Sequence, residues 1–117
     1  MKVPEVALVV VRTHRLEDVC DFYRALGFDF QEEQHGKGPV HFSAAAGPAV
    51  LEIYPLPEGA SVDASLRLGF FVDDVTAAVD SVRQNGGRVD TKPNSGPWGL
   101  RAVVRDPDGR AVELFQR

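Results

Sequence analysis

Two glutamates in matching apolar segments are the residues best placed to do chemistry. Glu52 lies within 49–55 (AVLEIYP), and Glu113 lies within 111–115 (AVELF). Period-two alternation in a strand places the aliphatic residues of each segment on one face and its glutamate on the other. A carboxylate among apolar residues needs water, a cation or a hydrogen-bond donor. The pair therefore predicts a polar site that holds a metal ion, a ligand or a neighbouring donor.

The same alternation brings further charged and aromatic side chains to the faces that carry the glutamates. Arg12 ends a strand expected over 6–12, and Arg67 begins one expected over 67–72. The aromatic residues on these faces are Tyr54, Phe71 and Phe115. If both sheets curve together, the result is an apolar cup with four convergent charges, a typical small-molecule site. The alternative is that the arginines are surface charges at strand ends and the glutamates are edge or interface carboxylates.

His41 and Trp98 are the other candidates for this site. His41 could act as a metal ligand or as a general base, since an unperturbed imidazole titrates at about 6.5; the alternative is a partly exposed strand histidine. Trp98 lies in a loop expected over 92–99 and could cover the cup, or could instead be a dimer contact or part of a satellite core. The remaining reactive side chains are expected to be inert, as solvated loop histidines (His14 and His35) and a buried core thiol (Cys20).

The elements that must position these residues occur twice along the chain. Each copy reads strand–helix–strand–strand–strand, with the first module at about 5–54, a Pro- and Ser-containing linker at 55–65 and the second module at about 66–117. This order predicts one α+β domain of two βαβββ modules related by a pseudo-twofold axis. The expected strands are 6–12, 28–31, 40–45, 49–55, 67–72, 88–91, 100–105 and 111–115.

Each module has one amphipathic helix with recognisable ends. Thr13 is the expected N-cap of the first helix, and Gly27 is its expected C-terminal stop. Asp73 or Asp74 is expected to cap the second helix, which ends at 85–87 (NGG). The apolar stripes of the helices should bury against the aliphatic faces of the strands that carry the glutamates, namely Leu51, Ile53, Val112 and Leu114.

Composition restricts the classes of partner. With 117 residues the chain fits a single domain, and a net charge of −4 argues against nucleic acid and against an anionic membrane surface. The apolar runs are too short for a membrane span, and the N-terminal segment lacks a secretory pattern. One cysteine excludes an intramolecular disulfide. We therefore expect a cytoplasmic protein with a small-molecule ligand.

Five motifs together resemble the vicinal oxygen chelate superfamily, which includes glyoxalase I, bleomycin-resistance proteins, fosfomycin-resistance enzymes and extradiol dioxygenases. They are 21–28 (DFYRALGF), 50–53 (VLEI), 71–74 (FVDD), 85–87 (NGG) and 106–114 (DPDGRAVEL). The resemblance covers essentially the whole chain. It implies paired βαβββ modules in a cupped mixed sheet with helices on the outer face, commonly as a homodimer whose sites form within one chain or across two.

The resemblance also shows where this chain departs from the metal-dependent members. In those members four positions, in the first and last strand of each module, hold one divalent ion. Two match as Glu52 and Glu113, but the other two fall on Leu8 and Arg67. Leucine has no ligand atom, and a guanidinium is a permanent cation. We therefore expect no metal at this position, and expect Arg67 to pair with Glu52, Glu113 or both.

The resulting functional expectation is a metal-free small-molecule-binding protein of the glyoxalase/bleomycin-resistance type, with an unidentified ligand and no cofactor. Its expected binding residues are Arg12, His41, Glu52, Tyr54, Arg67, Phe71, Trp98, Glu113 and Phe115. The alternative is a divalent-metal-dependent lyase, isomerase or dioxygenase with Glu52 and Glu113 as ligands. That enzyme would need His41, water or a partner chain to complete the coordination sphere.

Overall fold

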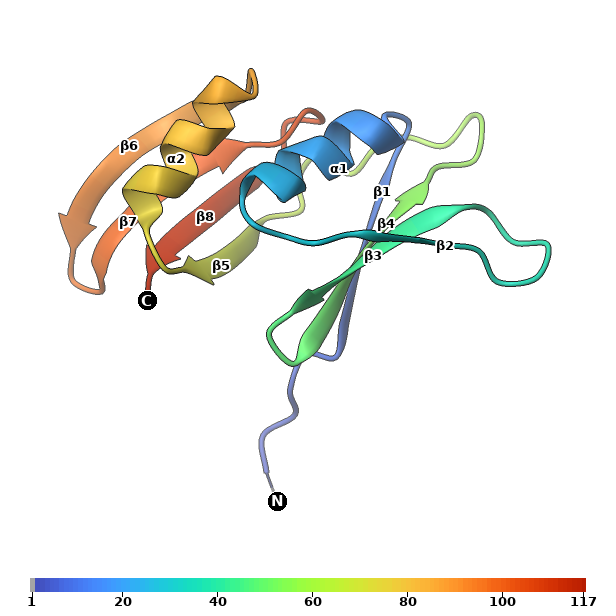
Figure 1. Cartoon of the computed structure of the whole chain (residues 1–117), viewed down its shortest axis with the longest axis horizontal. Coiled ribbons are helices and arrows are strands. Elements are labelled where there is room, and N and C mark those ends of the chain that lie inside the picture. Colours follow the sequence, from blue (N-terminus) through green and yellow to red (C-terminus); the bar gives the residue numbers. More distant parts are fainter. Residues whose placement is uncertain (1) are drawn as a thin grey trace.

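The computed structural model describes residues 2–117 and contains two four-stranded mixed sheets, each with one helix (Figure 1). The strand orders are β1-β4-β3-β2 and β5-β8-β7-β6, and in each sheet the first strand of the module pairs parallel with the last. The first module contains β1 (Leu8–Thr13), α1 (Leu16–Ala25), β2 (Gln31–Glu33), β3 (His41–Ala46) and β4 (Ala49–Pro55). The second contains β5 (Leu68–Val72), α2 (Val75–Gln84), β6 (Arg88–Gly96), β7 (Gly99–Arg105) and β8 (Ala111–Gln116).

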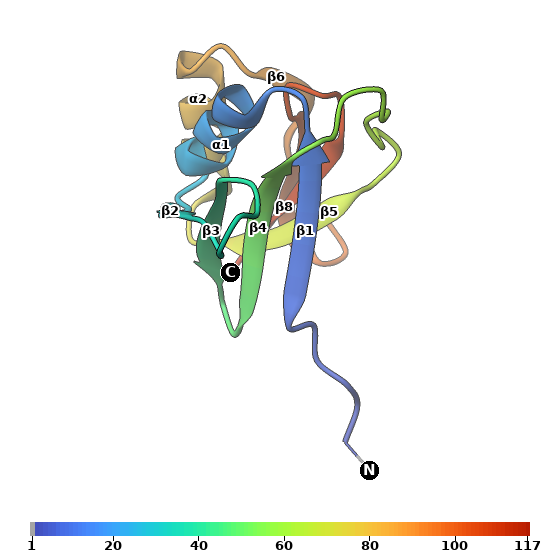
Figure 2. The same cartoon turned by 90° about the vertical axis from the view of Figure 1, so that its right-hand side faces the viewer.

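The expected α+β architecture with repeated βαβββ order is confirmed. Both helices lie on the same side of the molecule, with the sheets on the other side (Figure 2). The two sheets remain separate within residues 2–117. Within residues 2–117, the four charges that the alternation was expected to bring together in one cup therefore lie on two separate sheets.

The helices bury against the predicted aliphatic faces. Leu51, Ile53, Val112 and Leu114 are all essentially inaccessible to solvent, together with the helix residues that face them. Asp74 Oδ1 accepts a hydrogen bond from the Ala77 amide at 3.0 Å, which confirms an aspartate cap on α2. Gly27 has a φ of 114°, a conformation that a side chain disfavours, and so it ends α1 as predicted.

Three predicted boundaries were wrong. The N-cap of α1 is Arg15, not Thr13; the Thr13 hydroxyl instead accepts a hydrogen bond from the Arg15 amide at 2.9 Å just before the helix. The strand expected over 28–31 begins only at Gln31, because Phe28 and Phe30 pack into the core instead of joining the β2–β3 ladder. The first strand begins at Leu8 and not at Val6, and it ends at Thr13; Val11 and Thr13 are buried, whereas Leu8 and Arg12 are exposed.

The predicted loop over 92–99 was also wrong, since most of it belongs to β6. This strand runs from Arg88 to Gly96 and pairs with β7 through two register shifts. Pro93 has no backbone N–H to donate, and it is tolerated because β6 is an edge strand, which has no neighbouring strand to bond on its outer side. Trp98 therefore sits in the short turn between β6 and β7, not in a long flexible lid.

A buried polar network joins the two modules. Tyr23 on α1 donates its hydroxyl to Asp106 Oδ2 at 3.0 Å, and burial raises the pKa of this phenol. Arg110 donates to the same carboxylate oxygen at 3.0 Å and to the main-chain oxygen of Arg12 at 2.6 Å. The β7–β8 turn of the second module is thereby tied to both α1 and the end of β1.

Candidate functional site

A row of polar side chains crosses the open face of the first sheet. Glu33 and His41 are register partners on β2 and β3, so their side chains share this face. The His41 ring stacks on Tyr54 of β4 with centroids 4.0 Å apart and an interplanar angle of 9°. The Arg12 guanidinium on β1 lies 5.3 Å from the Tyr54 ring centroid, within cation–π range. All four strands of the sheet thus contribute to one continuous row.

His41 is the best-anchored member of this row and is fully buried, not partly exposed as one sequence-based alternative held. Its Nδ1 lies 3.2 Å from the Pro39 carbonyl oxygen, which can only accept, so Nδ1 carries the proton. In the neutral ring Nε2 then accepts a hydrogen bond from the Tyr54 hydroxyl at 3.2 Å. Glu52 Oε2 lies 3.8 Å from the same Nε2.

The second sheet carries a separate charged group around Glu113. Arg67 donates to Glu113 Oε1 from Nε at 3.0 Å and also from Nη2. Arg101 on β7 places its Nη2 3.4 Å from the same oxygen. The hydrogen bonds from Arg67, with the positive charge of Arg101, lower the pKa of Glu113 below its ordinary value. Two guanidinium groups therefore hold one ionised carboxylate.

Aromatic side chains flank this ion group. Phe71 and Phe115 are register partners on β5 and β8 with ring centroids 6.0 Å apart, and Phe71 is 70 % exposed. Gly69 lies opposite Glu113, and a Cβ there would approach the Phe115 ring to 3.2 Å. Because Gly69 has no side chain, the Phe115 ring can lie close to the Gly69 backbone, next to Glu113. Trp98 is 82 % exposed at the β6–β7 turn.

The structure thus divides eight of the nine predicted site residues into two groups, and Trp98 lies exposed outside both. Arg12, His41, Glu52 and Tyr54 gather on the first sheet, and Arg67, Phe71, Glu113 and Phe115 gather on the second. Within residues 2–117, Arg67 forms its ion pair with Glu113 and not with Glu52. No ion pair or hydrogen bond in the described part of the chain joins the two groups.

The residues at the four metal positions implied by the resemblance do not fit a metal ion. Leu8 is 54 % exposed on the open face and offers no ligand atom. Arg67 already neutralises Glu113, and Arg101 adds a second positive charge at the same oxygen. A divalent ion at Glu113 would have to displace two guanidinium groups. Of the four positions, only Glu52 and Glu113 could then bind a divalent ion, and these two carboxylates lie on separate sheets. Zn²⁺ favours imidazole or thiolate ligands.

Three neighbours of these groups were not among the predicted site residues. Arg101 could have been recognised, because alternation along the predicted strand 100–105 puts it on the same face as Val103, the register partner of Glu113. Glu33 was missed because β2 was placed too early in the sequence. His35 was predicted to be solvated, which its exposure confirms, and its ring centroid also lies 5.2 Å from that of His41.

A groove of about 840 Å³ lies between the modules. It is lined by the end of α1, the β3–β4 turn, β5 and the first turns of α2, and includes Phe28, Phe70 and Phe71. The groove meets the open face of the second sheet at Phe71. Among residues 2–117, no helix has the length and apolar character needed to cross a membrane.

Comparisons with known proteins agree with this architecture. The profile of the Glyoxalase/Bleomycin resistance protein/Dioxygenase superfamily matches residues 5–114. A protein of Mycolicibacterium smegmatis without an assigned function is 29% identical over 95% of this chain and 92% of its own length. A lactoylglutathione lyase of Arabidopsis thaliana is 31% identical over 93% of this chain, but the match covers only 43% of that enzyme. The chain thus spans less than half of this curated enzyme.

Solved structures of similar fold include binding proteins and enzymes. TnmS3, an antibiotic-binding protein from Streptomyces sp. CB03234, is 30% identical with a TM-score of 0.75, over 99% of this chain and 98% of its own. Glyoxalase I of Zea mays gives a TM-score of 0.79 at 20% identity, over 96% of this chain and 44% of its own. TioX from Micromonospora sp. ML1 gives 0.74 at 19% identity, over 97% and 98%. The last two likenesses show the fold alone.

Proposed function

Because the chain belongs to the Glyoxalase/Bleomycin resistance protein/Dioxygenase superfamily, we propose that it is a small-molecule-binding protein that holds no metal between Glu52 and Glu113. The observation that carries this proposal is the ion group of Arg67, Arg101 and Glu113. In this group, guanidinium groups balance the charge of the Glu113 carboxylate at the position where metal-dependent relatives hold a metal ion. The antibiotic-binding neighbour TnmS3, similar over nearly its full length, supports binding over catalysis.

The proposed ligand is a planar or aromatic organic molecule with polar substituents. The exposed ring of Phe71 beside Phe115 offers a stacking surface, and Tyr54 offers a second one under the Arg12 guanidinium. The charged groups would fix the orientation of the ligand through hydrogen bonds, as a few polar groups do in otherwise apolar sites. Each face mixes charge signs, which disfavours a strongly cationic ligand.

We propose that a second copy of the chain completes the pocket. In one chain the two charged faces lie on separate sheets. Both faces also expose aliphatic or aromatic residues, including Leu8, Val50 and Phe71. Pairing the first sheet of one copy with the second sheet of another would cover these residues and bring the two charged groups together. The cytoplasmic location expected from the sequence stays a prediction.

A thermal-shift screen of aromatic antibiotics, run in EDTA, tests the binding function. We expect at least one compound to raise the melting temperature, because a ligand that binds only the folded state stabilises it. Arg67→Gln should reduce that shift. The matched control is Arg83→Gln, which removes an arginine paired with Asp80 on the exposed side of α2, outside both faces.

Metal-dependent catalysis by this protein would overturn the proposal. In that case the protein loaded with Ni²⁺ or Zn²⁺ would form lactoylglutathione from methylglyoxal and glutathione, or would show another metal-dependent turnover. Glu113→Gln would then abolish both the activity and the metal bound at this position. The dimer is tested by light scattering after size-exclusion chromatography: a monomer that still binds the compound with unchanged affinity would contradict a pocket shared by two chains.

A further inference from the structure

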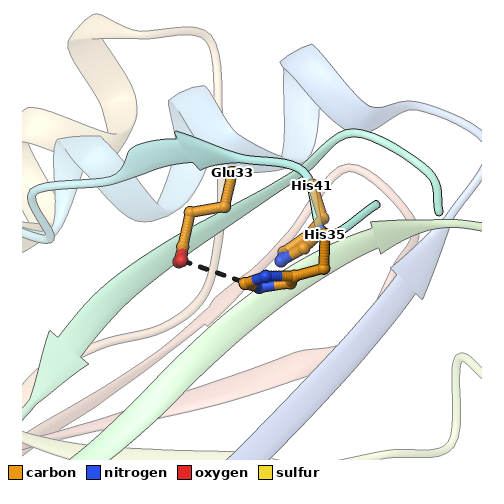
Figure 3. Close-up of side chains that lie close together, drawn as sticks. All are labelled: Glu33, His35 and His41. Atoms are coloured by element: carbon orange, nitrogen blue, oxygen red, sulfur yellow. Dashed lines mark ion pairs between the residues drawn. The ribbon is translucent and has the colours of Figure 1, made fainter. Parts of the chain in front are cut away.

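A cluster of two histidines and one glutamate lies at the β2–β3 hairpin, outside the metal positions of the superfamily. One ligand atom from each of Glu33, His35 and His41 can be chosen so that all three lie within 4.8 Å of one another. Figure 3 shows the Glu33 carboxylate and the two imidazole rings converging on one place. Glu33 Oε2 lies 3.9 Å from His35 Nε2. Three strong metal donors thus gather at one place.

The hairpin geometry explains why these residues converge. Glu33 is the last residue of β2 and faces His41, the first residue of β3, across the ladder. His35 lies in the connecting loop, where the Gly38 amide donates to the His35 carbonyl oxygen at 3.0 Å and closes the turn. The turn brings the His35 ring over the His41 ring, with centroids 5.2 Å apart. The cluster is therefore built by local chain geometry.

His41 is already held in the way that metal-binding histidines are held. Its Nδ1 donates to the Pro39 carbonyl oxygen at 3.2 Å, which fixes the tautomer and makes Nε2 the acceptor nitrogen. Nε2 accepts a hydrogen bond from the Tyr54 hydroxyl at 3.2 Å, and a metal ion at Nε2 would replace that hydrogen bond. The ring is fully buried and stacked on Tyr54, so its orientation is fixed as well. Glu52 Oε2, 3.8 Å from Nε2, adds negative charge next to the cluster. An oriented, buried imidazole beside two carboxylates is a typical environment for a cation.

We propose that Glu33, His35 and His41 bind one Zn²⁺ ion. Two imidazoles and one carboxylate form a known zinc donor set, with a fourth position left for water or another oxygen ligand. Zinc–nitrogen bonds of about 2.0–2.1 Å in a tetrahedron place ligand atoms about 3.3 Å apart, so the cluster must contract on binding. This contraction is accessible because the side chains of His35 and Glu33 are 73% and 36% exposed and can rotate.

The proposed site is separate from the ion group of Arg67 and Glu113 that carries the binding function proposed above. It lies wholly in the β2–β3 hairpin of the first module, whereas Arg67 and Glu113 lie in the second. Zinc would tie β2 to the start of β3 and would fix the end of the row that continues through Tyr54 to Arg12. It would therefore rigidify one edge of the open face without replacing any group that the ligand is proposed to contact in the second module.

Calorimetric titration of ZnCl₂ into the untagged, EDTA-stripped protein tests the site. We expect one equivalent per chain, and we expect His35→Asn and Glu33→Gln each to weaken binding about 10-fold or more. Both residues are accessible, so these variants should fold; circular dichroism checks this. The matched control is His14→Asn, which removes an exposed loop histidine that bonds the Ala60 carbonyl oxygen.

Cobalt substitution gives a second, spectroscopic readout. Co²⁺ bound to the wild type should show the intense visible bands of a tetrahedral ion, and these bands should be absent in His35→Asn and present in Glu113→Gln. Unchanged zinc affinity in His35→Asn, or loss of zinc in His14→Asn, would overturn the proposal. Loss of zinc in Glu113→Gln would place the metal at the superfamily position instead, and would contradict this proposal and the metal-free binding function together.

Discussion

Replacing Arg110 should be among the most damaging single substitutions in this chain. Its side chain is 2% exposed, and its guanidinium donates to Asp106 at 3.0 Å and Asp108 at 2.9 Å. It also donates to the main-chain oxygens of Arg12 at 2.6 Å and Asp63 at 3.2 Å. Arg110→Met keeps an apolar stem of similar length and removes the cation. Two buried carboxylates and two carbonyl oxygens then lose this donor, although Asp106 keeps its hydrogen bond from Tyr23.

The expected loss follows from the burial of this network. Removing one partner of a buried ion pair leaves an uncompensated charge and costs about 3–5 kcal/mol of unfolding free energy. An ordinary domain has about 5–15 kcal/mol in total, so the variant loses a large fraction of its stability. The melting temperature should fall by roughly 10–20 °C for a chain of this size. Urea titration followed by circular dichroism measures the change directly.

Arg105→Met is the matched control, because Arg105 lies just before the same turn and pairs with Asp90 at 2.9 Å. Its side chain is 31% exposed, so water screens the pair and the expected loss is only about 0.2–1 kcal/mol. The reasoning is refuted if Arg110→Met loses no more stability than Arg105→Met. A loss below about 1 kcal/mol would mean that the buried network does not hold the modules together.

Three further predictions concern charge, reactivity and helix capping. The pKa of Glu113 is lowered in the folded state, so its ion pair stabilises the protein at pH values above the ordinary pKa of 4.5, and this contribution is lost as the pH falls through the folded-state pKa. Urea titrations should show Glu113→Gln to be about 0.2–1 kcal/mol less stable than the wild type at pH 7, and this difference should vanish in acid. A difference that stays constant with pH would contradict the prediction. Burial raises the pKa of the Cys20 thiol to about 12, so a chromogenic disulfide reagent at pH 8 should label it only after denaturation, and immediate labelling of the native protein would disprove this. Asp74→Ala should cost about 1 kcal/mol by thermal melting, because it removes the cap of α2, whereas the highly exposed neighbour Asp73→Ala should cost much less; equal losses would contradict the capping role.

Most of the fold could be predicted because it depends on periodic burial and on local signals. The stripes that include Leu51 and Val112 follow from alternation, and Asp74 and Gly27 end their helices by local chemistry. The errors fell where tertiary context overrides local preference. Threonine is a favoured N-cap residue, but Thr13 lies two residues before the N-cap position of α1. The strand β6 contains a proline, which is tolerated because β6 lies at the edge of its sheet.

For the candidate residues, the sequence predicted which face of each sheet they share but not how the two faces are arranged. Alternation correctly gave the faces of Glu52, Arg67 and Glu113, and the structure shows the expected pair of Arg67 with Glu113. Whether two sheets close on each other depends on packing between modules, which periodicity does not encode. The same limit applies to His35, whose approach to His41 is set by the path of the β2–β3 turn.

The central claim is that a small organic molecule binds the open sheet faces without a metal ion. The most direct test is a nitrogen-15 NMR titration, in EDTA, with the aromatic antibiotic that gives the largest thermal shift. The account predicts that the largest changes fall on the side-chain Nε signals of Arg67 and Arg12 and on the amides of β4 and β8 around Glu52 and Glu113. Changes confined to the groove beside α2, or binding that appears only after a divalent metal is added, would contradict it.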